Sequence, residues 1–240
     1  MVPKKPAHPD PFAVAFLERL QDRPEAEQFV LGGYFALKHY LDYRDTADVD
    51  AWWRTRFDPR ALDAAREAFA AAAAQFGYSV RERSWGETVS LDAVAGAENV
   101  FSFQVATRSI EIEAPIASPW GSIPIETLDE NIAAKMSALV SRGAPRDFVD
   151  VKAVVDAGLV PLGRCWELWL VKNPGRSLDD ARLAVQNRLA GIVARTPLER
   201  LPPERRNEAA ALRVWFRDVF AHEDVDKAGG PSPDGEASQQ

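Results

Sequence analysis

Residues 29–53 read FVLGGYFALKHYLDYRDTADVDAWW, and this stretch decides the fold of the 240-residue chain. A short apolar run leads into Gly32-Gly33, a short amphipathic helix is expected next, and a polar loop follows. The end of the stretch is predicted as a strand with an apolar face and with Asp48 and Asp50 on the other face, because side chains alternate along a strand. The stretch therefore predicts a buried strand that displays two carboxylates side by side.

The segments around this stretch indicate an α+β fold. Helices are predicted at 11–21 and over the alanine-rich segment that ends at Gly77. Strands are predicted at 47–53 and in three or four later segments joined by short turns, YSVRERSW, ETVSLDAV, NVFSFQVAT and SIEIEAPI. Their spacing is typical of an antiparallel meander.

From residue 125 onward the pattern is helical. Thr127 and Glu130 fit a capping box at the start of a helix predicted over 128–142, and four more helices are predicted at about 145–157, 164–172, 177–195 and 203–222. We therefore expect an α/β domain over 1–124 with a mixed or antiparallel sheet, and a C-terminal helical bundle over 125–223. The polar tail over 224–240 is rich in Gly and Pro and is expected to be disordered.

Composition predicts a soluble protein of a reducing compartment. No apolar run approaches the roughly 18 residues of a membrane span, and the N-terminus lacks a signal peptide, so we expect no membrane partner and a cytoplasmic location. The single cysteine, Cys165, excludes an internal disulfide, and a total of three histidines argues against a histidine-based metal centre.

Charge is distributed unevenly along the chain. The net charge is −7, yet residues 131–200 hold eleven Lys or Arg against seven Asp or Glu, a net +4 that leaves −11 for the rest. This asymmetry permits a basic face on the helical half, which would suit a nucleic acid. Ordinary solvated helix surfaces explain it equally well.

The two strand carboxylates are candidate metal ligands. Asp48 and Asp50 repel each other unless a cation lies between them, and oxygen ligands at this spacing suit Mg²⁺ or Mn²⁺. A second pair, Glu111 and Glu113, alternates with isoleucine in the same way. If its strand lies beside the first, one of these glutamates would complete a three-carboxylate cluster for two divalent ions. Taken alone, the second pair equally fits an ordinary half-exposed strand.

The glycine pair supplies the context for these carboxylates. Gly32-Gly33 before a helix lets the backbone approach a phosphate closely, and the helix N-terminus favours its negative charge. A glycine pair, an Asp-x-Asp strand about 15 residues later and a distant acidic strand follow one another here. This ordered layout is typical of enzymes that transfer a nucleotidyl group.

Two blocks of the sequence resemble the AbiEii/AbiGii-type nucleotidyltransferases, the toxins of type IV toxin–antitoxin and phage-abortive systems, within the DNA polymerase β-like superfamily. The first block, residues 29–53, is similar to the family's glycine-pair helix entry and Asp-x-Asp strand. The second, ETLDENIAAKMSALVSRGAPRDFVDVKAVV, is similar to its lysine helix followed by Arg-Asp-Phe-x-Asp. The resemblance covers about residues 28–157 and implies a nucleotidyltransferase-like sheet domain whose site the helical domain completes.

The resemblance implies a role for each matching residue. Three carboxylates would be catalytic metal ligands, namely Asp48, Asp50 and Glu113, with Glu111 as the substitute for the third. Six residues would bind the nucleotide, namely Gly32, Gly33, Lys135, Arg142, Arg146 and Asp150. Lys135 would also act in catalysis by neutralising phosphate charge, and Asp147 with Asp150 would orient that lysine or the incoming group.

The reaction implied by the resemblance moves a nucleoside monophosphate from an NTP to a hydroxyl group, with Mg²⁺ or Mn²⁺ as cofactor. The implied acceptor is a tRNA 3′ end or a protein. A cognate antitoxin is a further implied partner.

Two departures from the family pattern keep other interpretations open. Tyr34 stands where the family often has Ser or Thr, and Glu113 stands where it often has Asp. A non-catalytic member of the fold that binds nucleotide or a protein partner would accommodate both. A nucleotidyltransferase that acts on a small cationic molecule would suit the net charge of −11 outside 131–200.

The second block also has a purely structural interpretation. Lys135 and Arg142 are seven residues apart and therefore share one helix face. They would pair with Asp147 and Asp150 and stabilise a turn between two helices.

Overall fold

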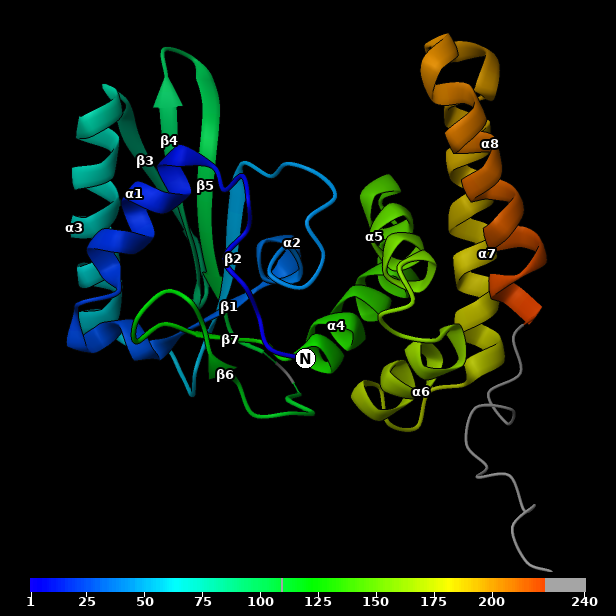
Figure 1. Ribbon diagram of the computed structural model, residues 1–240, viewed down its shortest axis with the longest axis horizontal. Helices are drawn as coiled ribbons and strands as arrows, with labels where there is room; N and C mark the ends of the chain where they lie inside the picture. Colours follow the sequence, from blue (N-terminus) through cyan, green and yellow to red (C-terminus); the bar gives the residue numbers. More distant parts are fainter. Residues whose placement is uncertain (109, 223–240) are drawn as a thin grey trace, which may run out of the picture. The chain divides into compact units, whose positions relative to one another are not determined.

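The computed structural model describes residues 1–108 and 110–222, and it divides into two compact units between Lys135 and Met136 (Figure 1). All of the described strands lie in the first unit. Helix α4, Leu128–Ser141, runs through the division, and helices follow it to the end of the described chain. The predicted α+β class is confirmed. The tail expected to be disordered, 224–240, lies outside the described residues.

A seven-stranded mixed sheet in the order β3-β4-β5-β2-β1-β7-β6 forms the first unit. Its strands are β1 Phe29–Gly32, β2 Asp48–Trp53, β3 Ser79–Trp85, β4 Thr88–Ala95, β5 Glu98–Ala106, β6 Ile116–Ala117 and β7 Pro124–Ile125. The predicted antiparallel meander is confirmed for β3, β4 and β5. β2 pairs antiparallel with β1 and parallel with β5, so the strand that carries the two aspartates lies inside the sheet.

Two helices cover one face of this sheet, α1 Pro11–Leu20 and α3 Pro59–Phe76 (Figure 1). Each begins at an aspartate, Asp10 or Asp58, whose carboxylate accepts hydrogen bonds from two free N–H groups of the first turn. As predicted, Gly77 ends α3, and its φ of +71° is a conformation that glycine adopts without strain.

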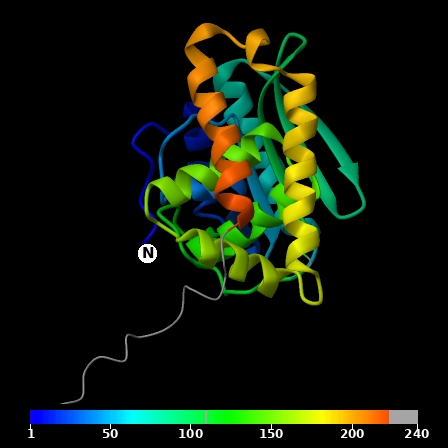
Figure 2. The ribbon, with the colours of Figure 1, turned by 90° about the vertical axis from the view of Figure 1, so that its right-hand side faces the viewer.

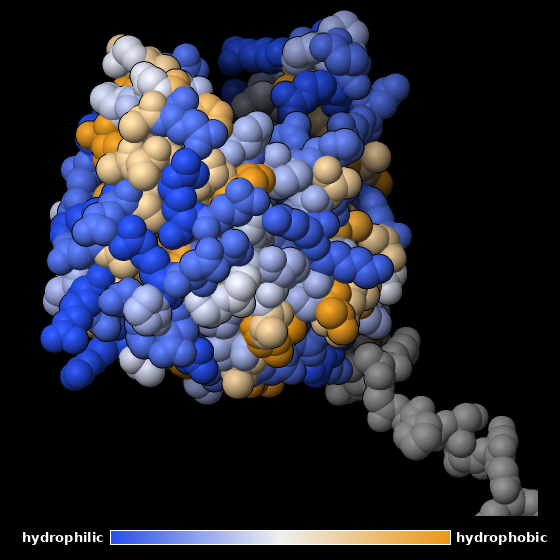
Figure 3. Space-filling view, turned by 60° about the vertical axis from the view of Figure 1, so that its left-hand side comes forward, coloured by the Kyte–Doolittle hydropathy of each residue, from blue (hydrophilic) through white to orange (hydrophobic). Residues whose placement is uncertain are grey.

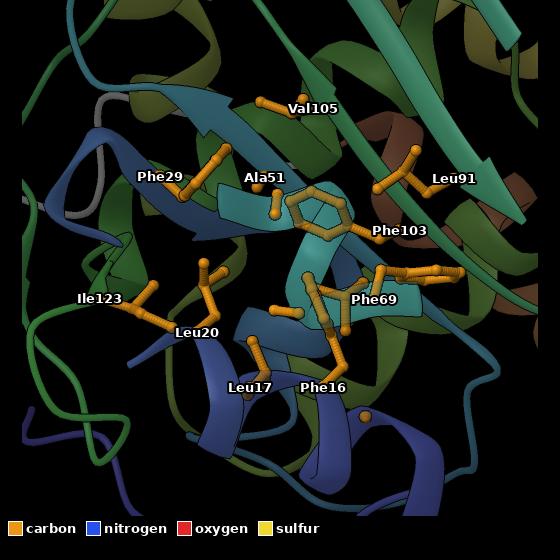
Figure 4. Close-up of a cluster of buried hydrophobic side chains, with 14 of the residues drawn as sticks. Phe16, Leu17, Leu20, Phe29, Ala51, Phe69, Leu91, Phe103, Val105 and Ile123 are labelled. Atoms are coloured by element: carbon orange, nitrogen blue, oxygen red, sulfur yellow. The ribbon is translucent and has the colours of Figure 1, made fainter. Parts of the chain in front are cut away.

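The hydrophobic core of the first unit lies between these helices and the sheet (Figure 4). Val49 and Ala51 of β2 point into it, and Phe103 of β5 packs against Phe16 of α1 with ring centroids 4.9 Å apart. Because strand side chains alternate, the intervening residues of β2 point to the opposite face of the sheet. The core therefore determines which face displays the carboxylates.

The prediction of a strand at 109–116 is wrong. Of its described residues only Ile116 belongs to a strand, the two-residue β6. The backbone N–H groups of Ile112 and Glu113 donate to the Glu130 carboxylate, at 2.8 and 3.3 Å, rather than to a neighbouring strand. Arg108, only 8% exposed, pairs in turn with Glu130 at 3.3 Å. The Glu130 side chain of α4 therefore satisfies two N–H groups that a strand ladder would otherwise bond.

The second unit is helical, as predicted. Its helices are α5 Pro145–Asp156, α6 Leu162–Lys172, α7 Leu178–Arg195 and α8 Pro203–Asp218, and α7 and α8 run antiparallel (Figure 2). Phe216 packs on Phe148 and on Phe220, with ring centroids 4.7 Å apart in both pairs. Cys165 is buried within α6, as expected. Three short 3₁₀ helices complete the described chain, at Pro24–Gln28, Leu198–Arg200 and Phe220–His222.

The surface is mostly polar on the face that Figure 3 presents, where hydrophobic side chains occur in separate small groups. Within the described residues, no helix is both long enough and apolar enough to cross a membrane.

Candidate active site

The two aspartates of β2 lie on the face of the sheet opposite the core. Asp50 is paired with Gly32 of β1 and with Gln104 of β5, and Asp48 is paired with Ser102 of β5. Both carboxylates belong to half-buried residues, and the Thr46 hydroxyl donates to Asp48. Since β2 has a ladder on each side, the direction of both side chains is fixed by the backbone.

The glycine pair carries the chain from β1 into α2, Gly33–Leu37, directly beside Asp50. Gly33 has a φ of +60°, and a Cβ at this position would overlap the Asp50 carboxylate. A Cβ on Gly32 would overlap the indole of Trp52. Both positions therefore require glycine, and the backbone passes the Asp50 carboxylate with no side chain in between.

A buried polar network fixes the position of the glycine pair. Asn131 of α4 donates through Nδ2 to the Gly33 carbonyl at 2.9 Å and to one Glu126 oxygen at 2.8 Å. The other Glu126 oxygen accepts from Trp52 Nε1 at 2.6 Å. Glu126 and Asn131 are fully buried. Neither was predicted from the sequence, because Trp52 and Gly33 are distant in the chain and no local pattern links them to Glu126.

Tyr34, which departs from the family pattern, holds the loop that leads to β2. Its hydroxyl donates to the Arg44 carbonyl at 2.9 Å and accepts from the Arg44 N–H at 3.0 Å. The Arg44 guanidinium lies over the tyrosine ring, 3.4 Å from the centroid, and Lys38 Nζ donates to the same carbonyl at 2.9 Å. Burial raises the pKa of Tyr34 above its usual value, so the phenol stays neutral at physiological pH. The larger side chain thus anchors the loop.

Lys135 places a cation near α2. It lies on α4, it is only 8% exposed, and its Nζ is 5.7 Å from the centroid of the Tyr34 ring. Lys135 therefore lies close to α2, the helix that begins at Gly33. Gly33 in turn lies beside Asp50.

The two glutamates at 111 and 113 lie in the loop that replaces the predicted strand. Glu113 accepts a hydrogen bond from the Thr127 hydroxyl, and Glu111 pairs with Arg108. Among residues 1–108 and 110–222, no group of three or more His, Cys, Asp or Glu is placed to hold a metal ion. The structure therefore does not gather Glu113 or Glu111 with Asp48 and Asp50.

The remaining candidates belong to the second unit. Asp147, fully buried, binds Arg142 through two bonds of 2.9 Å and accepts from the Ala144 N–H at 3.0 Å. Asp150 is also fully buried on α5, and Arg146 is exposed. The pairing of Arg142 with Asp147 at the start of α5 is the one that the structural interpretation of the second block predicts.

A second polar cluster lies on the same face of the sheet as the aspartates. Asp92 of β4 is fully buried and binds Arg81 and Arg83 of β3 at 3.2 and 3.0 Å. Burial alone would raise the pKa of Asp92, but the hydroxyls of Ser102 and Ser90 and the two guanidinium groups lower it, so the carboxylate stays ionised. The alternation in RERSW was the signal for this cluster, although no role was inferred from it.

Comparison with known proteins agrees with this architecture. A crystal structure of a candidate nucleotidyltransferase from H. pylori superposes with a TM-score of 0.54 over 92% of this chain and 96% of that chain, at 15% identity. At this identity the likeness shows the fold, which is that of a nucleotidyltransferase. No curated protein gives a match.

The family follows from the sequence match. The family described as nucleotidyl transferase AbiEii toxin, type IV TA system, matches residues 15–222. The chain therefore belongs to the AbiEii family of nucleotidyltransferase toxins, as the resemblance of the two blocks predicts.

Proposed function

We propose that the protein transfers a nucleoside monophosphate from an NTP to a hydroxyl acceptor in a reaction that depends on a divalent metal ion. The observation that carries this proposal is the pair Asp48 and Asp50, fixed on one face of β2 next to Gly33, whose missing Cβ lets the backbone pass close to the Asp50 carboxylate. Membership of a nucleotidyltransferase family supports it.

The residues present fit Mg²⁺ or Mn²⁺. Mg²⁺ in enzymes of this kind is bound by one or two carboxylates together with substrate phosphates and water, and Asp48 and Asp50 supply two carboxylates on one face. A bound divalent ion would neutralise the charge that develops on the phosphates and favour ionisation of the acceptor hydroxyl. We propose no third protein ligand, since within the described residues no third carboxylate is grouped with Asp48 and Asp50 to hold a metal ion.

The chain's own residues would bind and orient the reactants. The backbone at Gly32 and Gly33 would lie against the triphosphate, and the Lys135 cation near α2 would neutralise part of its charge. The acceptor oxygen would attack the α-phosphorus while the bond to the β-phosphate oxygen breaks, so pyrophosphate leaves and the hydroxyl proton passes to a carboxylate of the pair. Most of the acceleration would come from positioning and charge neutralisation.

The second unit would contribute the rest of the family signature. Arg142 and Arg146 would bind nucleotide phosphate, and Asp147 would hold Arg142 in place through its two bonds. Asp150 would support the same region of α5 from its buried position.

Membership of a type IV toxin–antitoxin family supports a proposal for the partners. The acceptor would be a tRNA 3′ end or a protein hydroxyl, and a cognate antitoxin would neutralise the toxin in the cytoplasm.

Nucleotide transfer is tested with the purified protein, each α-³²P-labelled NTP, Mg²⁺ or Mn²⁺, and total bacterial RNA. Label is expected on RNA or on the protein itself. The variant Asp48→Ala/Asp50→Ala should lose at least about a hundredfold in rate, because several kcal/mol of charge stabilisation depend on the bound ion.

The matched control is Asp45→Ala, which removes a carboxylate that is 99% exposed in the loop before β2. It should transfer label at the wild-type rate. The proposal would be refuted if no label were transferred from any NTP with either metal. It would also be refuted if the Asp48→Ala/Asp50→Ala variant transferred label at the wild-type rate.

A further inference from the structure

One edge of the sheet carries cations and an aromatic ring in a row. Along β3, Arg81, Arg83 and Trp85 alternate with other residues and therefore share one face of the strand. All three are exposed: the arginine side chains at 51% and 54%, and Trp85 at 51%. This edge strand thus presents an aromatic ring in line with two guanidinium groups. We refer to these three residues as the β3 stripe.

The stripe faces the same side of the sheet as the two aspartates. Strand pairing aligns Arg83 with Ser90, Gln104 and Asp50 in one row. It aligns Arg81 with Asp92, Ser102 and Asp48 in the next row. Residues directly opposite each other in a sheet point to the same face. The β3 stripe and the aspartates therefore belong to one surface, about 14 Å apart across three strand spacings.

The surface between them is small and polar. β5 contributes Ser102 and Gln104, which are half-buried, whereas Ser90 and Asp92 of β4 are buried beneath this surface. Asp92 is buried beneath the arginines, and its bonds to both guanidinium groups hold them in position on the sheet. Two cations on one buried anion leave a net positive charge at the β3 end of this face, apart from Asp48 and Asp50 on β2.

The opposite face of β3 differs in character. There Glu82 pairs with Arg66 of α3 at 2.5 Å, which neutralises both charges. Val80 is the exposed apolar residue on that face, at 42%. On β3, the excess of positive charge and the exposed aromatic ring thus lie on the aspartate face.

We infer that the β3 stripe binds the acceptor as a single-stranded nucleic acid, whose reacting end lies at Asp48 and Asp50 and whose preceding nucleotides cross β5 and β4 to β3. Arg81 and Arg83 contact backbone phosphates, and an unpaired base stacks on Trp85. Positive charge with an aromatic platform is the combination that single strands require. This inference rests on the proposed function, since it names the acceptor of the same site.

The test measures binding of a 5′-fluorescein 12-nucleotide single-stranded RNA by fluorescence anisotropy, without NTP or metal. Trp85→Ala is expected to raise the Kd roughly five- to 150-fold, the range for loss of one stacked base. Trp85→Phe should restore most of the affinity. A perfectly paired duplex of the same length should bind more weakly than the single strand, because its bases are not free to stack.

The arginines are tested with Arg81→Gln/Arg83→Gln/Asp92→Asn, which removes the buried carboxylate together with its partners and so avoids an unpaired buried charge. For two lost phosphate contacts, the slope of log Kd against log salt should fall by about 1.4. The matched controls lie on the opposite face: Val80→Ala and Arg66→Gln/Glu82→Gln should bind RNA within about twofold of wild type.

The result separates this inference from the proposed function. Asp48→Ala/Asp50→Ala should bind the RNA at least as tightly as wild type does, because the β3 stripe is intact and two carboxylates that repel phosphate are removed. Wild-type affinity in Trp85→Ala and in the arginine variant, or an equal loss in the controls, would refute the inference even if nucleotide transfer to RNA occurs. Loss of binding in the β3 variants would support it even if the transfer assay fails.

Discussion

Gly33 is a residue of the candidate site at which substitution is strongly restricted. It combines a φ of +60° with contact against the Asp50 side chain, whereas Gly77 has a φ of +71° with open space around the missing Cβ. Both glycines thus have a left-handed backbone conformation, but only Gly33 also lacks space for a Cβ. This pair separates the backbone cost of a Cβ from its effect on the site.

We predict that Gly77→Ala lowers the free energy of unfolding by about 1–2 kcal/mol, the cost of a left-handed residue with a Cβ, and leaves nucleotide transfer unchanged. Gly33→Ala should lose more stability and should also lose activity, because its Cβ displaces the Asp50 carboxylate. Urea unfolding and the label-transfer assay measure the two effects. Full activity in Gly33→Ala would show that the Asp50 carboxylate does not need its observed position.

Tyr34 shows how a departure from a family pattern can be structural. From the sequence alone, a tyrosine beside the glycine pair weakens the case for phosphate binding. In the structure its hydroxyl is fully used by the Arg44 backbone, and its ring is covered by the Arg44 guanidinium. The residue therefore fixes the position of the loop that leads to β2.

Elements are joined here by buried polar contacts, and His39 is the clearest case. It follows α2, and its Nε2 accepts a hydrogen bond from Trp120 Nε1 at 2.8 Å, while Nδ1 lies 2.8 Å from the Phe35 carbonyl and donates to it. Burial lowers the pKa of His39 to about 4, so the imidazole is neutral in the folded protein. The bond ties the end of α2 to the segment between β6 and β7.

This neutral histidine predicts an acid-sensitive fold. The unfolded chain binds a proton at His39 near pH 6.5 and the folded chain only near pH 4, so stability falls as the pH is lowered between these values, by up to about 3 kcal/mol. Urea unfolding at a series of pH values gives the free energy of unfolding as a function of pH. The slope of this free energy against pH should be smaller for His39→Gln than for the wild type. His8→Gln, which alters an exposed histidine, should keep the wild-type slope; an unchanged slope in His39→Gln would contradict the assignment.

Helices and the meander were predictable because their signals are local. The alanine-rich segment with its glycine stop, the alternation in β3 to β5, and the cap at Ser177 all lie within a few residues of the structure that they specify. The segment 109–116 failed for the opposite reason. Its alternation of Ile and Glu fits a strand, but Glu130, distant in sequence, takes its N–H groups.

At the scale of the whole molecule, the two compact units carry separate cores. The second unit is centred on aromatic residues, with Phe216 packed between Phe148 and Phe220. Tryptophans report on each unit: Trp53 and Trp120 are buried in the first, and Trp166 and Trp169 in the second.

We predict that Phe216→Ala destabilises the second unit by about 3–5 kcal/mol, the usual cost of removing a buried phenylalanine. Phe216→Ala is made in two backgrounds, one that keeps only Trp166 and Trp169 and one that keeps only Trp53 and Trp120, and thermal unfolding is followed by tryptophan fluorescence. The midpoint should fall relative to the parent background in the first case and stay unchanged in the second. An equal shift of both transitions would mean that the units unfold as one cooperative body.

The long-range pairings explain why the site was only partly predictable. The glycine pair, the Asp-x-Asp strand and Lys135 could be identified from local sequence. The parallel pairing of β2 with β5 could not, because α3, β3 and β4 intervene, and it is this pairing that aligns Arg81 and Arg83 with Asp48 and Asp50. Glu126 and Asn131 depend on long-range contacts in the same way.

The interior place of β2 has a consequence for errors in folding. A slip of one residue in its pairing would turn Asp48 and Asp50 into the hydrophobic core and expose Val49. Such a species would bury two unpaired charges, and it would be too unstable to persist. The stability of the fold therefore enforces the register of β2, and Asp48 and Asp50 face away from the core in every copy that folds stably.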